Sequence, residues 1–592
     1  MKHNQILMLT LGHNASAILY DLETGEAIGY EQERLTRIKG DSQFPADAIM
    51  EIMKHKLIER NKCMAFVSHW FPTKLLSNNA TCANNKYFTA KNEKLLHSLA
   101  YTVTFCGPTF SHHDAHAYSA IAFRDYFCKV ENRQLNIFSA LKGDVFTIVA
   151  DGFGNNREVL SIYEGKKLIE RIYGYGLSLG LMYQYATSFV GMKENQDEYK
   201  FLGYESHVRE YVSLGEIKNE IDCIVRYFIN EYHEDECTSM ILEEEIASLG
   251  CVKAFWYSKF DVILSYYTDV IASYPEGKKE FIQRCIIGYA VQAVVERVIL
   301  HYVQKYDMHD VNVAGGLFYN VKLNNAILTH IDGTFCPMPL AGDQGAAIGM
   351  AYQFVPEIAK YGFNFGNLCW GKRTFYNVDK AIKGLKMANF CDILCNYHIN
   401  DIAQKLANGN IVNIVGPNME FGPRALCMTT TLFLPTAENT AANNYMNGRN
   451  EVMPCAPVCT KENAQIMFSK KELDRVIGSD AFMICTHEYR KCVYPTNMRN
   501  GAMHVKPDDP TTFTGRPQIV FNKHSYISQI LIRVQELTGI EPLFLVNTSF
   551  NVHGQPIVFD LHSIIQNYKY QLEHAVTGHE PYLYIFASTE TI

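Results

Sequence analysis

Short apolar runs that end in glycine-containing turns are the first pattern in this chain. Ile6–Thr10, Val145–Ala150 and Val311–Val313 are such runs, and their length predicts short buried β-strands. Ala17–Tyr20 and Ala27–Gln32 follow the first run and predict two more strands joined by a tight turn. Much of the first half of the chain is therefore expected to consist of short strands with glycine turns at their ends.

Apolar residues at helical spacing predict helices between and after these strands. Residues 208–300 read as mainly helical, and Phe281–Gln304 carries a long, well-spaced apolar stripe. Gly345–Tyr352 predicts a helix of small residues, while Asn400–Asn408 predicts a helix that is followed by a strand over Ile411–Val415. No apolar run reaches about 18 residues, so we expect no membrane span.

The strand–turn–glycine elements recur near residues 12, 152, 315 and 343. Such repetition suits a duplicated α/β fold that clamps a nucleotide between its halves, the design of the actin/Hsp70/sugar-kinase fold. Lys360–Thr374 is rich in glycine, asparagine and aromatic residues, and we interpret it as the boundary to a second α/β part.

Composition narrows the class of protein. The chain has 592 residues, of which 47% are apolar and 20% charged, and this excludes disordered and collagen-like chains. The net charge of −8 argues against a globally basic nucleic-acid surface, although it leaves room for a local basic cleft. Seventeen cysteines without a C-x-x-C pair, and an N-terminus without a signal-peptide core, predict a cytoplasmic protein.

Two histidines give the first candidate for chemistry. In Ser111–Ala117, His112 and His116 are four residues apart, so a helix would place both imidazoles on one face. Two converging neutral imidazoles form half of a site for a divalent transition metal. Asp343, at a glycine-flanked turn, offers the oxygen ligand that is still missing. A chance pair on a surface or in the core is the alternative.

Several glycine turns could face a nucleotide or a cation. Asp151-Gly152 follows a strand, where a carboxylate can hold a cation or water, although a plain β-turn has the same letters. Gly315 and Gly316 would let the backbone approach a ligand closely. Glu31–Pro45 is dense in both charge signs and is either a solvated loop or a substrate-facing loop in which Lys39 contacts a phosphate or carboxylate.

Three arginines stand beside glycine or proline, in loops rather than on helix faces. They are Arg424, Arg449 and Arg516. The guanidinium fork offers planar, paired donors that suit phosphate and carbamoyl oxygens. The alternative is that these loop arginines are simply solvated.

With these residues in view, the chain resembles the O-carbamoyltransferase family of nodulation-factor and antibiotic (aminoglycoside, ansamycin, cephalosporin) biosynthesis over nearly its whole length. The motifs that carry the resemblance are Gly12-His13-Asn14-Ala15-Ser16-Ala17, Glu33-Arg34, Lys39-Gly40-Asp41, Phe44-Pro45, His112 with His116, Asp151-Gly152, Gly315-Gly316 with Asn320, Gly342-Asp343, Glu420-Phe421-Gly422-Pro423-Arg424-Ala425-Leu426, Arg449 with Met453-Pro454, Gly515-Arg516-Pro517-Gln518 and Asn547-Thr548-Ser549-Phe550-Asn551.

The resemblance implies two domains and one reaction sequence. Residues 1–360 would form an ASKHA-type domain, and 373–592 an α/β YrdC-like domain. The second would bind ATP and carbamoyl phosphate and make carbamoyl-adenylate. The first would transfer the carbamoyl group to an acceptor hydroxyl beside a metal, with Fe²⁺ expected first, Mn²⁺, Zn²⁺ or cobalt also accommodated, and Mg²⁺ accompanying ATP.

The resemblance also assigns roles to individual residues. His112, His116 and Asp343 would hold the metal. Arg424, Arg449 and Arg516 would neutralise carbamoyl phosphate, with Ser549 and Asn551 as hydrogen-bond donors. His13 would be a base or orienter and Lys39 a charge partner. The remaining nucleotide-site residues would be Asp151, Gly152, Gly315, Gly316 and Asn320.

Open questions concern the acceptor and one departure from the family motif. The acceptor is either a small hydroxylated molecule or a hydroxymethylated base in nucleic acid; no membrane partner is expected, and a homodimer is left open. After Leu426 the family continues Gly-Asn-Arg-Ser, whereas this chain has Cys427-Met428-Thr429-Thr430. A tRNA threonylcarbamoyl-type enzyme and a catalytically silent nucleotide sensor are the rival hypotheses.

Overall fold

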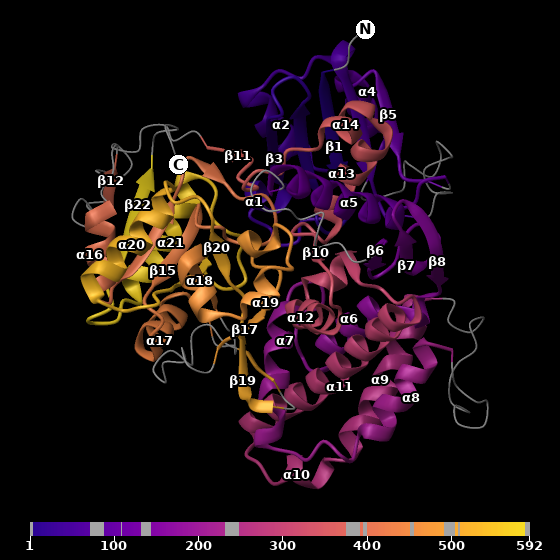
Figure 1. The fold of residues 1–592 in the computed structure, drawn as a ribbon, viewed down its shortest axis with the longest axis vertical. Coiled ribbons are helices and arrows are strands. Elements are labelled where there is room, and N and C mark those ends of the chain that lie inside the picture. Colours follow the sequence, from indigo (N-terminus) through magenta and orange to yellow (C-terminus); the bar gives the residue numbers. More distant parts are fainter. Residues whose placement is uncertain are drawn as a thin grey trace.

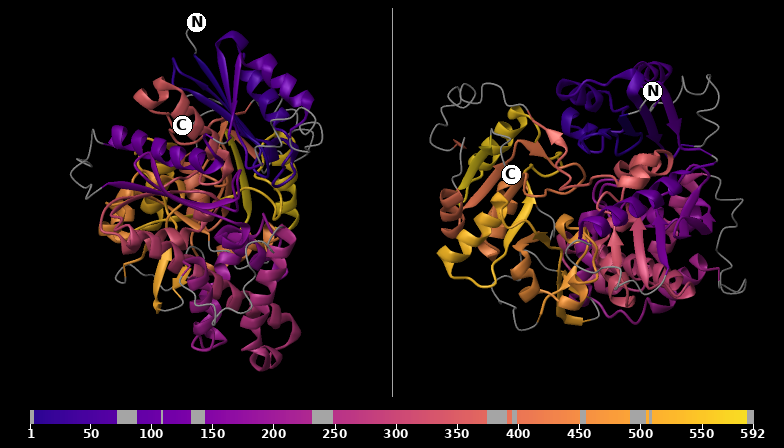
Figure 2. Two further views of the ribbon diagram at one scale, coloured as in Figure 1. Left: turned by 90° about the vertical axis from the view of Figure 1, so that its right-hand side faces the viewer. Right: turned by 45° about the horizontal axis from the view of Figure 1, so that its top comes forward.

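The computed structural model describes residues 4–71, 88–107, 109–131, 144–230, 248–373, 391–394, 399–449, 455–490, 504–506 and 509–586. The N-terminal part, indigo to pink in Figure 1, and the orange-to-yellow C-terminal part lie side by side, and the tilted view of Figure 2 shows the same arrangement. The site described below lies where these two parts meet.

The first half of the N-terminal part is built on a mixed sheet of five strands in the order β3-β2-β1-β4-β5. β1 pairs antiparallel with β2 and β2 with β3, while β1–β4 and β4–β5 are parallel. The strands are β1 Gln5–Thr10, β2 Ser16–Asp21, β3 Ala27–Glu31, β4 Cys63–Ser68 and β5 Thr102–Phe105.

The second half repeats this topology with the order β8-β7-β6-β9-β10. β6 and β7, and β7 and β8, are antiparallel, whereas β6–β9 and β9–β10 are parallel. The duplicated sheet confirms the predicted ASKHA-type fold, because each strand has a counterpart in the other half. The strands are β6 Val145–Ala150, β7 Glu158–Glu164, β8 Lys167–Tyr173, β9 Asp310–Ala314 and β10 Phe335–Pro337.

Helices cover both halves, and those of the second half form a layer at the end of the molecule opposite the N-terminus (Figures 1 and 2). The helices of the N-terminal part are α1 Gln32–Thr36, α2 Ala46–His55, α4 Ala90–Leu99, α5 His112–Glu131, α6 Leu179–Phe189, α7 Glu198–Tyr204, α8 Lys218–Phe228, α9 Leu249–Ser265, α10 Thr268–Ala272, α11 Glu276–Lys305, α12 Val321–His330, α13 Asp343–Phe354 and α14 Pro356–Tyr361.

The predicted helix over Phe281–Gln304 is confirmed as part of α11. An 18-residue window of α11 reaches a mean hydropathy of 1.3, but 67% of that window is buried inside the protein. Its side chains pack into the core of the second half, where Ile286, Val291 and Val298 are among the buried residues. Core packing therefore accounts for the apolar character of this helix.

The C-terminal part contains a mixed seven-stranded sheet in the order β12-β22-β13-β15-β21-β16-β20 and a small sheet in the order β17-β19-β18. The predicted helix and strand near residue 400 are confirmed as α16 and β13. The elements are β11 Gly371–Lys372, β12 Cys391–Leu394, α16 Ile399–Ala407, β13 Ile411–Val415, β14 Asn418–Met419, β15 Thr429–Phe433, α17 Ala437–Met446, β16 Ala456–Thr460, α18 Lys461–Met467, α19 Lys470–Leu473, β17 His487–Glu488, β18 His504–Lys506, β19 Asp509–Gly515, β20 Gln518–Val520, α20 Tyr526–Thr538, β21 Leu545–Ser549, α21 Leu561–Glu573 and β22 Pro581–Phe586.

This part is α/β, as predicted, while its YrdC-like identity stays a prediction. The assigned boundary between residues 360 and 373 also stays a prediction, and Thr374 lies outside the described residues. β11 already pairs with β14, so the chain contacts the C-terminal part by Gly371.

Two helices of the N-terminal part cross unusually closely and bring their first turns together. A Cβ atom on Gly349 of α13 would lie 1.9 Å from the carbonyl oxygen of Ala115 in α5. Only glycine allows this approach without a shift of one backbone against the other. His112, the first residue of α5, and Asp343, the first residue of α13, consequently lie next to each other.

Candidate functional site

Four side chains converge at the start of α5 and α13. His112, His116, Asp151 and Asp343 each offer one ligand atom, and these atoms all lie within 4.8 Å of one another. Nε2 of His112 is 3.1 Å from Nε2 of His116, 3.2 Å from Oδ2 of Asp151 and 3.2 Å from Oδ1 of Asp343. Ligands about 2.0–2.2 Å from a small divalent cation are separated by roughly these distances. The cluster therefore fits a metal ion.

The fold holds each of the four groups by a different element. α5 presents both imidazoles because of their i, i+4 spacing, and its first backbone N–H is held by Oδ1 of Asn155 at 2.7 Å. Asp151 follows β6, and its Oδ1 accepts a hydrogen bond from the backbone N–H of Gly316. Its Oδ2 is thus left to face the imidazoles.

The carboxylates dominate the electrostatics of this cluster. Burial lowers the pKa of His112, but the charges of Asp343 and Asp151 and their hydrogen bonds outweigh burial and raise it to about 10. Burial raises the pKa of Asp343, but the neighbouring imidazolium of His112 outweighs it and holds that pKa well below its usual range. The two carboxylates and the two imidazoles together therefore favour the binding of a cation at this point.

A second cluster, on the C-terminal part, is cationic. Arg424, Arg449 and Arg516 lie in loops, as predicted, and none of them forms a salt bridge within the described part of the chain. Burial lowers the pKa of Arg516, and repulsion from Arg424 lowers it further. Guanidinium groups stay protonated in proteins, so these arginines form an uncompensated positive cluster. Such a cluster is suited to an anion.

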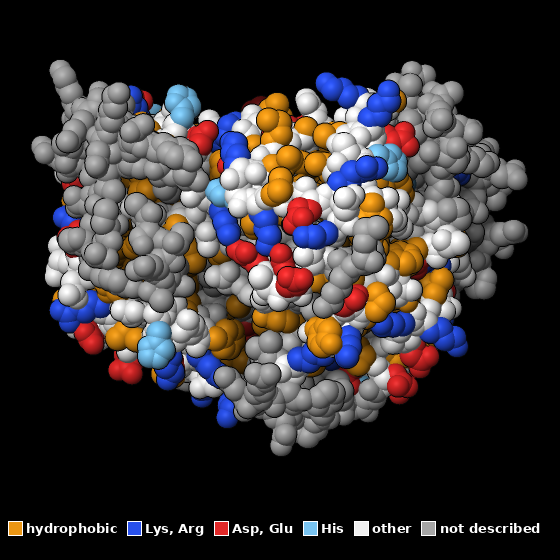
Figure 3. All heavy atoms as spheres, turned by 90° about the horizontal axis from the view of Figure 1, so that it is seen from above, with side chains coloured by type: hydrophobic (Ala, Val, Ile, Leu, Met, Phe, Trp, Pro, Cys, Tyr) orange, Lys and Arg blue, Asp and Glu red, His pale blue; other side chains and the backbone are white. Residues whose placement is uncertain are grey.

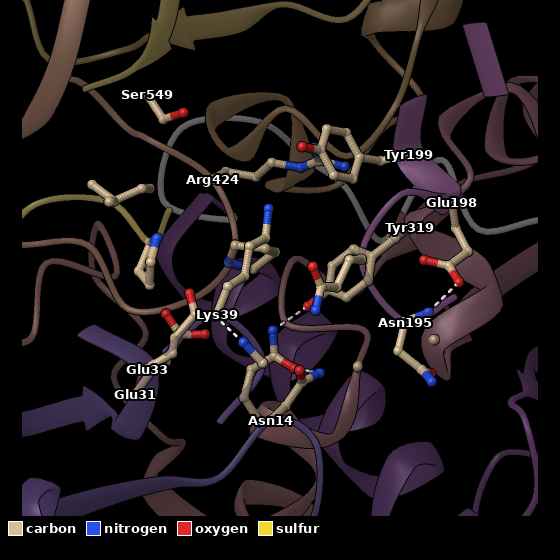
Figure 4. A pocket seen from close by; sticks show the side chains of 18 of the residues that line it. Asn14, Glu31, Glu33, Lys39, Asn195, Glu198, Tyr199, Tyr319, Arg424 and Ser549 are labelled. Carbon is tan, nitrogen blue, oxygen red and sulfur yellow. Dashed lines mark hydrogen bonds between the residues drawn. The ribbon is translucent and has the colours of Figure 1, made fainter. Parts of the chain in front are cut away.

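Both clusters open into one cavity of about 430 Å³. Figure 4 shows Asn14, Lys39 and Tyr319 reaching it from the N-terminal part, and Arg424 and Ser549 from the C-terminal part. Among the residues predicted from sequence, those that line the cavity are His13, Lys39, Asp151, Gly152, Gly316, Asn320, Asp343, Arg424, Arg449, Arg516, Ser549 and Asn551. His112, His116 and Gly315 lie behind the wall.

The glycine pair serves different purposes at its two positions. Gly315 has a φ of 100°, and a Cβ there would lie 2.2 Å from the carbonyl oxygen of Ala150. Gly316 lines the cavity and donates to Asp151. Asn320 also lines the cavity, but its side chain accepts from Leu323 N–H and donates to Gln292 Oε1. Its amide is thus occupied in joining α12 to α11.

Ser549 and Asn551, which are predicted hydrogen-bond donors, form different contacts in the structure. Nδ2 of Asn551 donates to the carbonyl oxygens of Val552 and Gln555, at 3.2 and 2.8 Å, so this nitrogen is engaged within its own loop. The backbone carbonyl of Ser549 accepts from Nη2 of Arg449 at 3.0 Å, while Nη1 of Arg449 donates to Thr548. Residues 548 and 549 therefore orient Arg449.

His13 and Lys39 both reach the cavity from the N-terminal part. Nδ1 of His13 is 3.8 Å from Oδ2 of Asp343, and its side chain is 46% exposed. Nζ of Lys39 is 5.2 Å from the ring centroid of Tyr199, and burial lowers the pKa of Lys39. Arg34, in the same charged segment, is only 2% exposed, so this segment is more than a solvated loop.

The stretch that departs from the family motif lies away from the cavity. None of residues 427–430 is among the cavity-lining residues. Cys427 has a φ of 69°, and its Sγ contacts Oε1 of Gln518 at 3.2 Å. The hydroxyl of Thr429, where the family has arginine, accepts from the buried side chain of Arg373 at 2.7 Å. The changed residues are therefore part of the core beneath the arginine loops.

The sequence did not predict three features of this site. Asp151 is expected at a nucleotide turn where its carboxylate can hold a cation or water, but the structure places that carboxylate beside His112 and His116. Glu198 lines the cavity, and burial raises its pKa to about 7. Tyr319 lines it too. The position of Asp151 just after a strand was a signal for a cation ligand, but Glu198 and Tyr319 carried none. The predicted motif residues Met453 and Pro454 lie outside the described part.

Comparison with known proteins gives two family matches. Residues 6–352 match the model described as Carbamoyltransferase N-terminus, and residues 403–579 match Carbamoyltransferase C-terminus. An uncharacterized protein of Methanocaldococcus jannaschii, MJ1051, is 26% identical over 93% of this chain and 94% of its own length. The nodulation protein NolNO of Sinorhizobium fredii is 22% identical over 93% of this chain and 75% of its own length.

Solved structures resemble the chain only distantly. HypF of T. kodakarensis is 13% identical over 61% of this chain and 49% of its own length, with a TM-score of 0.29. A ROK family glucokinase from Streptomyces griseus is 11% identical over 59% of this chain and 98% of its own, with a TM-score of 0.24. At these TM-scores neither adds to the argument from sheet topology.

Proposed function

This chain belongs to the carbamoyltransferase family, and from that premise we propose that it is an ATP-dependent O-carbamoyltransferase. The proposal rests on one observation: an uncompensated arginine cluster and a two-histidine, two-aspartate cluster open into the same cavity. The first suits an anionic carbamoyl donor, and the second suits the transfer of the carbamoyl group. The family match does not favour a threonylcarbamoyl-type enzyme.

The first step is the formation of carbamoyl-adenylate. One molecule each of carbamoyl phosphate, ATP and water gives carbamoyl-adenylate, pyrophosphate and phosphate, and Mg²⁺ accompanies the nucleotide. Arg424, Arg449 and Arg516 hold the phosphate oxygens of the donor, because forked donors in a water-poor cavity stabilise charge that would be hydrated outside. Lys39 is a charge partner on the opposite wall of the cavity.

The second step is transfer to an alcohol. The acceptor oxygen attacks the carbamoyl carbon, the bond from this carbon to the adenylate oxygen breaks, and AMP leaves. His13 takes or orients the acceptor proton, since it faces the cavity beside Asp343. His112, His116 and Asp343, joined by Asp151, would hold a divalent metal, which supplies Lewis-acid polarisation when bound. Fe²⁺ fits this N₂O₂ set, as do Mn²⁺ and Zn²⁺.

For the acceptor we favour a small hydroxylated molecule over hydroxymethylated nucleic acid. The net charge is −8. On the face in Figure 3, basic and acidic side chains are interspersed around apolar ones, without a broad basic field. Binding to a nucleic-acid backbone draws on many phosphate contacts by lysine and arginine. The remaining rival, a silent nucleotide sensor, loses its main support because residues 427–430 do not line the cavity.

The test is to identify the nucleotide products by chromatography. We expect AMP and pyrophosphate from ATP only when carbamoyl phosphate is present. Arg516→Ala should reduce pyrophosphate release by about 10²–10³-fold, while Arg533→Ala, on the exposed face of α20, serves as the matched control. Formation of ADP, or release that is independent of carbamoyl phosphate, would contradict the proposal. Mass spectrometry of candidate acceptors for an added carbamoyl group then identifies the alcohol.

A further inference from the structure

Tyr319 occupies the wall of the cavity between the two clusters. It ends the 3₁₀ helix Gly316–Tyr319 that follows β9, and it reaches the cavity close to Asn14 in Figure 4. The guanidinium carbon of Arg424 lies 5.9 Å from the centroid of its ring. Its ring is packed against Gly342, where a Cβ would lie 2.9 Å from Cε2. Tyr319 thus touches both the aspartate turn at 342–344 and the first arginine.

The Tyr319 hydroxyl oxygen accepts a hydrogen bond from a side chain of the aspartate turn. Nε2 of Gln344 donates to this oxygen at 2.6 Å. The amide of Gln344 is oriented by Asn14, whose Nδ2 donates to Oε1 of Gln344 at 3.1 Å. A phenolic hydroxyl that accepts this hydrogen bond still has its own proton to donate.

That proton has no acceptor among the residues that the structure describes. No hydrogen bond donated by the Tyr319 hydroxyl occurs there, and the side chain is half-buried at the wall of the cavity. Because the side chain lines the cavity, the O–H bond is directed at the space that a bound donor molecule would fill. A hydroxyl that faces the cavity without an acceptor among the described residues can donate to a ligand bound there, and this hydrogen bond gains importance once the ligand excludes water.

We propose that Tyr319 is a catalytic residue, whose hydroxyl donates a hydrogen bond to the carbonyl oxygen of the carbamoyl group during transfer. This inference rests on the proposed function. When the acceptor oxygen bonds to the carbamoyl carbon, the π electrons of the carbonyl move to its oxygen, which becomes negative. The C=O bond re-forms as the bond to the adenylate oxygen breaks and AMP leaves. A pre-oriented donor stabilises this charge without any reorganisation.

The experiment measures binding before kinetics. The probe is the sulfamoyl analogue of carbamoyl-adenylate, which keeps the carbamoyl carbonyl, and AMP is the reference ligand without it. In wild type the analogue should bind more tightly than AMP. Tyr319→Phe should weaken analogue binding by about 5–10-fold and leave AMP binding unchanged, the size expected for one neutral hydrogen bond. Tyr126→Phe, which loses a hydroxyl bond to Asn364 outside the cavity, is the matched control.

A second variant tests whether the orientation of the Tyr319 hydroxyl matters, and not only its presence. Gln344→Glu retains the shape of the side chain but replaces its donor by an acceptor, so the Tyr319 proton would turn to the carboxylate and away from the cavity. It should reproduce the loss in analogue binding seen with Tyr319→Phe although the phenol remains. Metal content is measured in both variants and should equal that of wild type.

Kinetics then locate the step. With enzyme in excess over ATP, Tyr319→Phe should retain the burst of pyrophosphate and slow the release of AMP, with water or glycerol as acceptor, by about 10²-fold. An unchanged ratio of analogue to AMP binding in Tyr319→Phe would overturn the inference, and so would a parallel loss of the pyrophosphate burst. If wild-type protein binds the analogue no better than AMP, the proposed function itself fails.

Discussion

The guanidinium of Arg34 donates through Nη2 to the carbonyl oxygen of Gly422 at 2.7 Å, across 388 residues of sequence. Oε2 of Glu31 accepts two hydrogen bonds, one from Nε of Arg34 at 3.1 Å and one from the backbone N–H of Gly422 at 3.3 Å. A buried ion pair in the N-terminal part thus holds both backbone polar groups of one residue, Gly422, in the C-terminal part. Gly422 lies two residues before Arg424, so the pair positions the first arginine of the anion cluster.

Arg34→Met is expected to destabilise the protein and to impair the first chemical step. The substitution leaves the carboxylate of Glu31 buried without its counter-ion, which typically costs about 3–5 kcal/mol. Urea denaturation measures this loss. In a double-mutant cycle, adding Glu31→Gln should recover part of it, because no unpaired charge is then buried. Arg60→Met, in an exposed turn, should stay within about 0.5 kcal/mol of wild type. Strictly additive effects of the two substitutions would contradict the coupling.

Gly349→Ala should push α5 and α13 apart at the point where their backbones nearly touch. The added methyl would lie 1.9 Å from the carbonyl oxygen of Ala115, so we expect a loss of about 1–3 kcal/mol in unfolding free energy. Metal affinity should fall as well, since the first residues of both helices carry ligands. Both quantities can be followed by thermal unfolding in the presence and absence of the metal.

Gly277→Ala in α11 is the matched control for this helix crossing. Nothing lies within 4 Å of a Cβ at that position, and alanine is favoured over glycine in a helix by up to about 1 kcal/mol. We expect a neutral or slightly stabilising effect. If both glycine substitutions behave alike, the close approach at Gly349 has no energetic importance.

The four-residue cluster predicts which side chains retain a metal. His112→Ala, Asp343→Asn and Asp151→Asn should each lower metal affinity by more than about 10²-fold, which exceeds the usual loss when an outer-shell partner is removed. Elemental analysis after dialysis measures the content. Asp114→Asn is the control, because Asp114 lies in the first turn of the same helix but contacts Tyr163 and Arg171 instead. Full metal content in Asp151→Asn would remove Asp151 from the site.

A buried histidine in the C-terminal part predicts a pH dependence of stability. Nε2 of His487 lies 2.6 Å from Oδ1 of Asp480. Burial lowers the pKa of His487, but the charge of Asp480 and hydrogen bonds to Asp480 and Glu472 outweigh burial and raise it to about 9. The folded protein therefore binds this proton more tightly than the unfolded chain does. The resulting stability is present in full below about pH 6.5 and is lost as pH rises toward 9.

His487→Gln tests this sign directly. The difference in unfolding free energy between wild type and variant should be largest near pH 6 and should shrink by up to about 3 kcal/mol by pH 9.5, following 1.36 kcal/mol per pKa unit. Chemical denaturation at several pH values measures it. A difference that stays constant, or grows with pH, would show that His487 is not protonated in the folded protein.

Local pattern was sufficient for much of the fold and for the kinds of chemistry at the site. The run Val145–Ala150 has the bounds of β6, and the apolar stripe of Phe281–Gln304 lies within α11. The spacing of His112 and His116 required only that the segment be helical, because residues one turn apart share a face. Arginines beside glycine and proline were correctly placed in loops.

The sequence pattern did not show which charged side chains are buried or which distant residues they contact. Glu31–Pro45 read as a charged segment that could be solvated, yet Arg34 is buried between the two parts of the molecule. For Asp151 the sequence leaves a cation-holding carboxylate and a plain β-turn open. In the structure the backbone N–H of Gly316 holds one carboxylate oxygen, and the other oxygen faces His112.

Residue identity and period, both readable along the chain, were enough to establish the duplicated sheets, the two imidazoles on one helix face and the arginine loops. The four-ligand cluster, the clamp on Gly422 and the free donor of Tyr319 depended on how distant elements pack. Periodicity reports neighbours within a turn or a strand, whereas these contacts join residues 25 to 388 positions apart in the sequence. They exist because a glycine at 349 lets two helices cross closely and because the two parts of the chain share one cavity.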